Sequence, residues 1–260
     1  MAQNVPGPVA VSRAVAEGAE ATKIESPRGG DPLEQLCKPW YVELHARVLV
    51  ERLDLKSAPG ISRCKTLLQD ADVFLASHRP SALARLGLDR DSLSREFPRL
   101  RHVNIVGDTA NPEEPGHDLT YQARAGLLQH AMPLTLFADM AGAERAHAAI
   151  KDVMREPGSS RVVGLYDALR DLAAPLHHGL TATGGPLSGR NPAYRAYPAR
   201  EGAIAVAALE PHFRARLYEG LGLADGEDLG DVFLTKSAGE WEQWASSLDL
   251  PLVALRPGHA

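Results

Sequence analysis

Residues 72–76, Asp72-Val73-Phe74-Leu75-Ala76, form a compact apolar run. A run of this kind is typical of a parallel strand that is buried on both faces of its sheet. Around it, apolar runs alternate with segments of helical periodicity, which predicts strands at 20–25, 48–55 and 100–106 and helices at 9–19, 56–68, 81–86 and 91–97. This alternation over the first hundred residues predicts a doubly wound α/β layer.

Sheets of this class bind ligands beyond the carboxyl ends of their strands. We therefore expect a ligand beside the loops that follow Leu75 and Val106.

The remainder of the chain is richer in helical pattern. We predict a strand at 159–163 and another at 204–209, with helices at 139–155, 166–177 and 211–221. Pro211 has the first position that proline favours in a helix. Trp241 and Trp244 lie three residues apart on one helical face and are interpreted as core, and residues 182–190 form a glycine-rich loop.

Composition narrows the function classes. The chain has 260 residues and a formal net charge of −5, which argues against nucleic-acid binding. No apolar run reaches the length of a membrane span, and the first residues lack a secretory signal pattern, so we expect a cytoplasmic protein. Cys37 and Cys64 are the only cysteines and lack the spacing of a metal site, so both are expected to be reduced and structural.

Several common site motifs are absent. The sequence contains no GxGxxG after a strand, no Walker A sequence, no HExxH and no GxSxG. The sequence therefore lacks the motifs that usually indicate a dehydrogenase, a P-loop enzyme, a zinc hydrolase or a serine esterase. No metal site is expected.

One histidine stands at a position suited to chemistry. Pro115-Gly116 breaks the chain, His117 follows, and the apolar spacing from Leu119 onward predicts a helix with Asp118 as its N-cap. Backbone N–H groups point outward at a helix start and suit a developing negative charge. On these residues alone His117 is better interpreted as an ordinary turn residue.

Several stretches in order resemble the family III CoA transferases, the CaiB/BaiF family. The similarity is carried by residues 19–25 with Gly30-Asp31-Pro32, by 53–57, 72–75 with His78-Arg79-Pro80, 86–88, 116–119, 138–142 and 209–213. The order of these blocks over about residues 5 to 255 makes the resemblance specific, and it is closest to the α-methylacyl-CoA racemase-like branch.

The resemblance implies a Rossmann-like large α/β domain over residues 1–175, which binds CoA, and a smaller α+β domain over 176–260 that is incomplete relative to the family. It implies acyl-CoA thioester substrates, no permanently bound cofactor, and a homodimer whose chains interlock like rings. Compared with the family pattern, the fold is expected to be shortened at both ends. It places catalytic residues at His117, Asp139 and Glu210, and CoA contacts at Arg79, Lys56, Gly116 and Tyr121.

Two reactions are compatible with these residues. In α-proton transfer, His117 and Asp139 flank the α-carbon as two bases, Glu210 orients His117, and N–H groups at the start of the Asp139 helix stabilise the enolate. In CoA transfer, the Asp139 carboxylate attacks the thioester to form an anhydride, which the loop at Gly184-Gly185 shields from water. Because many transferases lack the histidine, His117 favours proton transfer.

Simpler interpretations remain open at each position. Asp139 is also a good N-cap residue, Glu210 a solvated residue at a helix start, and Arg79 a surface charge. A third alternative is a shortened, non-catalytic relative that binds CoA or a partner protein.

Overall fold

The computed structural model describes residues 1–128 and 131–256. The chain divides into two compact units, Met1–Ala173 and Ala174–Ala260. Each unit is described by itself.

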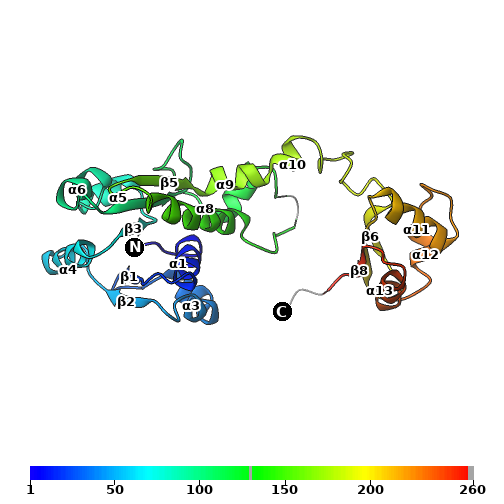
Figure 1. Cartoon of the computed structure of the whole chain (residues 1–260), viewed down its shortest axis with the longest axis horizontal. Coiled ribbons are helices and arrows are strands. Elements are labelled where there is room, and N and C mark those ends of the chain that lie inside the picture. The colour runs from blue at the N-terminus through cyan, green and yellow to red at the C-terminus, as the bar shows by residue number, and fades with distance from the viewer. Residues whose placement is uncertain (129–130, 257–260) are drawn as a thin grey trace. The chain divides into compact units, whose positions relative to one another are not determined.

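The first unit alternates strands and helices along the chain (Figure 1). Its strands are β1 (Thr22–Glu25), β2 (Leu49–Arg52), β3 (Val73–Ala76), β4 (Arg101–Val106) and β5 (Ser160–Gly164). Its helices are α1 (Pro6–Ala16), α2 (Pro32–Leu36), α3 (Lys38–Leu44), α4 (Ala58–Gln69), α5 (Pro80–Arg85), α6 (Arg90–Glu96), α7 (Asp118–Arg124), α8 (Phe137–Val153) and α9 (Leu165–Leu172).

All strand pairs in this unit are parallel. β1 pairs with β2, and β3, β4 and β5 form a three-stranded sheet in that order. The buried strand predicted at 72–76 is confirmed, with Phe74 and Leu75 on opposite faces of β3 and in different cores.

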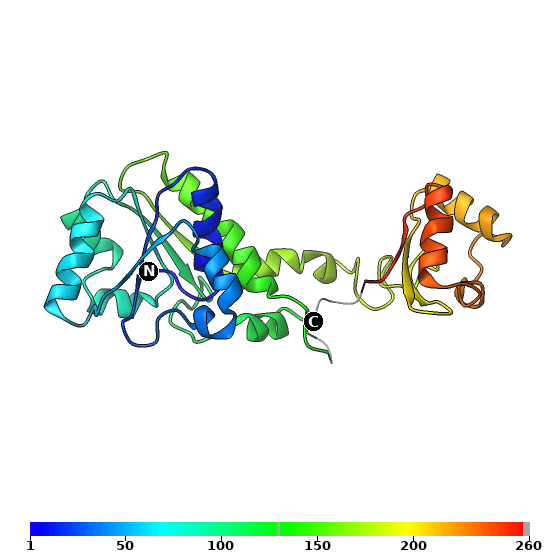
Figure 2. The same cartoon turned by 90° about the horizontal axis from the view of Figure 1, so that it is seen from below.

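Helices cover both faces of the β3–β4–β5 sheet. Phe74 and Ala76 pack with apolar residues of α4, α5 and α6, whereas Leu75, Val103 and Ile105 pack with α1 and α8. Figure 2 shows α4 on one side of the strands and the helices α1 and α8 on the other. The predicted doubly wound α/β fold is therefore confirmed.

A buried ionic cluster joins β1 to the segment that follows it. Lys23 Nζ donates to Asp31 Oδ2 at 2.5 Å and lies 3.1 Å from Glu25 Oε1, and all three side chains are at least nine-tenths buried. The Tyr41 hydroxyl of α3 donates to Glu25 Oε1 at 2.8 Å, and Asp31 caps α2 by accepting from the Leu33 N–H at 2.9 Å. The cluster fixes α2 and α3, which the sequence analysis did not predict, beside the end of β1.

The second unit has its own sheet and core. Its strands β6 (Tyr194–Pro198), β7 (Ala203–Ala207) and β8 (Leu252–Ala254) are antiparallel, and its helices are α10 (Ala174–His177), α11 (Pro211–Leu221), α12 (Gly230–Phe233) and α13 (Ala238–Ser247). Figure 2 shows the last three helices on one side of the sheet. Trp241 is 2% exposed and its Nε1–H donates to the Phe233 carbonyl at 2.8 Å, so its predicted place in the core is confirmed.

One predicted helix is interrupted. Residues 166–177 form two helices, α9 and α10, because Pro175 has no N–H to donate and its ring clashes with the carbonyl four residues earlier. The glycine-rich segment 182–190 is a loop, as predicted. Within the described residues, no helix combines the length and the apolarity that crossing a membrane requires.

Candidate functional site

The junction between α7 and α8 brings two of the predicted catalytic residues to neighbouring helix starts. His117 is the N-cap of α7 in extended conformation, with φ −138° and ψ 165°, and it is exposed. Its N–H donates to Thr120 Oγ1 at 3.1 Å, and its carbonyl accepts from the Thr120 and Tyr121 N–H groups. The prediction that Asp118 is the N-cap of this helix is wrong by one residue, because His117 has the N-cap position and Asp118 is already the first helical residue.

Asp118 instead caps the neighbouring helix. It is 5% exposed, and its Oδ1 accepts hydrogen bonds from the N–H groups of Ala138 at 2.7 Å and Asp139 at 3.1 Å. The prediction that the N–H groups at the start of the Asp139 helix can stabilise an enolate is therefore wrong for these two groups. The Met140 N–H is also engaged, by the Leu136 carbonyl.

Asp139 is the third residue of α8 and is half-buried there. Burial raises the pKa of its carboxyl to about 7, and the nearby charge of Asp118 contributes in the same direction. A carboxyl with such a pKa exchanges protons readily near neutral pH, which is what acid–base catalysis requires. Asp139 is not the N-cap of α8, because that position belongs to Leu136.

Tyr121 packs between two glycines beside the same junction. Its side chain is 6% exposed, and a Cβ at Gly116 or at Gly107 would collide with the phenol. Gly107 directly follows β4, so one of the two loops expected to border a ligand meets α7 here. Burial raises the pKa of the Tyr121 hydroxyl, and the Asp139 carboxyl adds to the rise.

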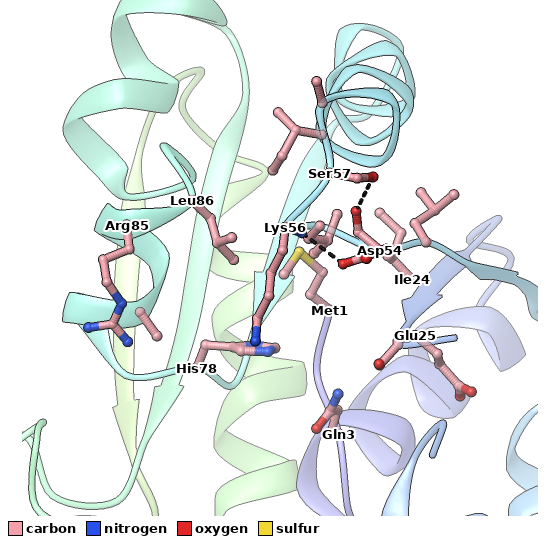
Figure 3. A pocket seen from close by; sticks show the side chains of 16 residues that line it. Met1, Gln3, Ile24, Glu25, Asp54, Lys56, Ser57, His78, Arg85 and Leu86 are labelled. Atoms are coloured by element: carbon pink, nitrogen blue, oxygen red, sulfur yellow. Dashed lines mark hydrogen bonds between the residues drawn. The ribbon is translucent and has the colours of Figure 1, made fainter. Parts of the chain in front are cut away.

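A separate cavity of about 780 Å³ lies at the carboxyl ends of β1, β2 and β3. Its lining includes Glu25 at the end of β1 and Ser26 after it, Lys56 and Ser57 after β2, and His78 after β3. Figure 3 shows Lys56 extending toward His78, with Arg85 of α5 on another side of the cavity. The cavity is where ligands bind in sheets of this class, and two cations at its wall suit phosphate groups.

Arg85 is a further cation at the cavity wall, and the sequence patterns alone do not single it out. It stands in the last turn of α5, directly before the Leu86-Gly87-Leu88 block, and that position was the available signal. Arg79 is the exposed N-cap of α5 and is not among the residues that line the cavity, so its contact with CoA stays a prediction.

Glu210 belongs to the second unit, where it is the exposed N-cap of α11. His117 and Asp139 are in the first unit and Glu210 is in the second, so the contact predicted between Glu210 and His117 stays a prediction. Within the described residues no group of three or more His, Cys, Asp or Glu side chains is arranged to hold a metal ion.

Comparison with known proteins assigns the chain to a family. The family model CoA-transferase family III matches residues 1–250. The human α-methylacyl-CoA racemase is 28% identical over 279 aligned positions, covering 92% of this chain and 71% of the racemase. The cinnamoyl-CoA:phenyllactate CoA-transferase of Clostridium sporogenes is 35% identical over 124 residues, covering 42% of this chain and 30% of the transferase.

The fold has a solved counterpart in Rv3272 from Mycobacterium tuberculosis. That structure matches with a TM-score of 0.85 at 22% identity, covering 99% of this chain and 81% of the other. This match supports the fold alone. The assignment of the chain to a family rests on the family model. The chain belongs to the family III CoA transferases, the family whose members act on acyl-CoA.

Proposed function

We propose that this protein transfers a proton at the α-carbon of an acyl-CoA thioester, as a racemase or epimerase of 2-methylacyl-CoA or related thioesters. The observation that carries the proposal is the Asp139 carboxyl, half-buried at the start of α8, with a pKa raised to about 7 by burial and by Asp118. At neutral pH both of its protonation states are populated, so the same group can take up a proton and return it.

The reaction needs two groups that face one carbon atom. One base removes the α-proton and leaves the electron pair as an enolate of the thioester, and the other group delivers a proton to the opposite face. His117 is the second group in our proposal, because the residue that follows it, Asp118, is hydrogen-bonded to the backbone of Asp139. The role predicted for Glu210 stays a prediction, tested by the activity of Glu210→Gln.

The enolate oxygen needs hydrogen-bond donors. The N–H groups of Asp118 and Leu119 begin α7 directly after His117, and among the described residues neither has a hydrogen-bond acceptor. We assign the enolate oxygen to these groups, in place of the amides of α8 that Asp118 occupies.

We place the nucleotide end of CoA in the cavity beside β1, β2 and β3. Lys56 and Arg85 supply positive charge at its wall, and the side chains of Leu53, Ile61 and Leu86 supply apolar surface for a base. Both enzyme relatives named above carry CoA in their names.

CoA transfer through an Asp139 anhydride is the second candidate. A transferase relative is 35% identical over its aligned part, and the same carboxyl serves as the nucleophile in that reaction. A non-catalytic relative that binds CoA is the third. A homodimeric state and a cytoplasmic location stay predictions.

The test is deuterium exchange at the α-carbon of a 2-methylacyl-CoA in heavy water, followed by NMR. We expect exchange with the parent chain, loss of at least about 100-fold in His117→Ala and Asp139→Asn, and no change in His178→Ala, which alters an exposed histidine elsewhere.

Absence of exchange contradicts proton transfer and directs attention to the other candidates. Trapping of an Asp139 adduct by hydroxylamine in the presence of thioester then supports CoA transfer. Binding of CoA without exchange or adduct supports the non-catalytic relative.

A further inference from the structure

A buried carboxylate joins the two helices that carry His117 and Asp139. Asp118 belongs to α7, but its Oδ1 accepts from two N–H groups in the first turn of α8, at 2.7 Å from Ala138 and 3.1 Å from Asp139. Hydrogen bonds from backbone N–H groups to a carboxylate are charge-assisted and directional. They determine where the first turn of α8 lies relative to α7.

Gln122 fixes the orientation of this carboxylate. It lies one turn after Asp118 on α7, is fully buried, and its Nε2 donates to Asp118 Oδ2 at 2.5 Å. The same Nε2 donates to the Thr135 carbonyl at 3.2 Å, in the segment that leads into α8. Both partners are acceptors, so the side-chain amide has only one orientation that satisfies them.

We propose that Asp118, oriented by Gln122, is a positioning residue that holds the start of α8, and with it the Asp139 carboxyl, in place. This inference rests on the proposed function, in which Asp139 exchanges the proton. It assigns separate tasks to neighbouring groups, since the His117 imidazole faces the substrate in the proposed function and the Asp118 side chain acts through Asp139.

The groups around Asp139 make an electrostatic effect of Asp118 testable. Among the described residues, the titratable groups that interact with its carboxyl are Asp118 and Tyr121, both on α7. Burial favours the protonated form of Asp139, and the negative charge of Asp118 adds to that preference. Tyr121 is neutral at working pH, because burial raises the pKa of its hydroxyl, so Asp118 is the charged neighbour.

Two substitutions separate charge from geometry. Asp118→Asn keeps an oxygen that accepts from the two N–H groups and removes the charge, but its NH2 group then faces Gln122 Nε2. Gln122→Ala keeps the charge and loses that same hydrogen bond, so it controls for the loss. Asp118→Ala removes both the charge and the acceptor. Asp89→Asn is the matched control, because Asp89 also accepts from two N–H groups at a helix start, those of Asp91 and Ser92 in α6.

The first measurement is the carboxyl titration of Asp139 in the full chain without substrate, by carbon-13 NMR, with the signal assigned from Asp139→Asn. We expect Asp118→Asn to lower the pKa of Asp139 by about one unit, since a neighbouring like charge is removed. Asp89→Asn is expected to leave that pKa unchanged.

The second measurement is the pH profile of deuterium exchange. In Asp118→Asn we expect the profile to move to lower pH by the same amount, with KM within about twofold of the parent. In Asp118→Ala we expect kcat to fall about 100-fold, as for a catalytic group misplaced by about 1 Å. A residue that only stabilised the fold would lower the melting temperature without moving the pH profile.

The inference is overturned if Asp118→Asn leaves the pKa of Asp139 within 0.2 units, a margin of about 0.3 kcal/mol, and Asp118→Ala retains the parent kcat. If the parent shows no exchange, the proposed function fails, and the titration still decides whether Asp118 controls Asp139.

Discussion

The imidazole of His102 is stacked on the ring of Phe74, with ring centroids 5.3 Å apart and planes 12° from parallel. The two residues are register partners on β4 and β3, and His102 is 8% exposed. Its Nε2 is buried and has no hydrogen-bond partner in the described part of the chain. Burial, with a smaller contribution from Arg90, lowers the pKa of His102 to about 4.

This histidine makes the fold sensitive to acid. Between about pH 6.5 and 4 the unfolded chain takes up a proton at His102 that the folded chain refuses, so the free energy of unfolding decreases as the pH falls. The full loss is about 3 kcal/mol. His102→Phe keeps the ring stack and removes the titration, so its stability, measured by urea unfolding at pH 7.5, 6 and 5, is expected to vary less with pH. His178→Phe, at an exposed position, serves as control, and parallel curves for His102→Phe and the parent would contradict the assignment.

The buried cluster at β1 depends on its lysine. Lys23→Met leaves the buried carboxylate of Asp31 without its cation and that of Glu25 with only Arg52, whose Nε lies 4.0 Å from Oε2. We expect a loss of about 3–5 kcal/mol in the free energy of unfolding. Lys65→Met removes an exposed bridge to Glu96 and is expected to cost less than about 1 kcal/mol. Both losses are measured by urea unfolding. Equal losses would show that the buried cluster contributes no more to the free energy of unfolding than the bridge between Lys65 and Glu96.

The two glycines beside Tyr121 contact different parts of its side chain. A Cβ at Gly107 would collide with the hydroxyl but lie 3.1 Å from Cζ, whereas a Cβ at Gly116 would lie 2.5 Å from Cζ and 2.6 Å from Cε1. Gly107→Ala and Gly116→Ala are each expected to cost about 1–3 kcal/mol. Adding Tyr121→Phe should restore most of the melting temperature in the Gly107→Ala background and little in the Gly116→Ala background. Equal rescue in both backgrounds, judged against Tyr121→Phe alone, would contradict the packing described.

The Asp139 carboxyl, which provides activity in the proposed function, is also expected to lower the stability of the folded protein at neutral and higher pH. Its pKa is raised to about 7, so the folded state loses stability as the pH rises from about 4 through 7. Asp139→Asn removes this dependence, and we expect it to gain about 1–4 kcal/mol at pH 8 while deuterium exchange is lost. Thermal unfolding at pH 5 and pH 8 measures the gain, and a variant that is less stable than the parent at pH 8 contradicts the raised pKa.

The cavity cations are expected to bind CoA phosphates. Lys56→Ala and Arg85→Ala should each weaken CoA binding about tenfold, or about 1.4 kcal/mol, in isothermal titration calorimetry. Lys65→Ala removes a partly exposed lysine that does not line the cavity and should leave the affinity within about twofold. A loss in Arg79→Ala similar to that in Arg85→Ala supports the contact predicted for Arg79. Unchanged affinity for CoA in both cavity variants would contradict the proposal that CoA binds in this cavity.

Elements with strong local signals were predictable from the sequence. The apolar run of β3 and the start of α11 at Pro211 lie where their patterns placed them. By contrast, α2 and α3 depend on the buried charges of Lys23, Glu25 and Asp31, which no local pattern identifies as buried. β6 and β8 are short and obtain their stability from pairing with β7.

The sequence suggests candidate residues for the site, and their roles stay predictions. It does not suggest how those residues are connected. His117 and Asp139 were found through their family blocks. The role of Asp118 was not, because a residue that looks like the cap of its own helix caps a helix about 20 positions later in the sequence. Arg85 was missed because a lone arginine at the end of a helix is ambiguous until the strand ends around it are placed.

The contact between α1 and α8 has a consequence for biosynthesis. α1 is made early, but α8 is complete only when residue 153 has been added, and the sheet strand β5 follows it. At 5–20 residues per second, the apolar side of α1 waits on the order of ten seconds for its partner. During that interval Ala10 and the neighbouring apolar residues of α1 are exposed in the nascent first unit. Binding by a chaperone would be most useful at this stage.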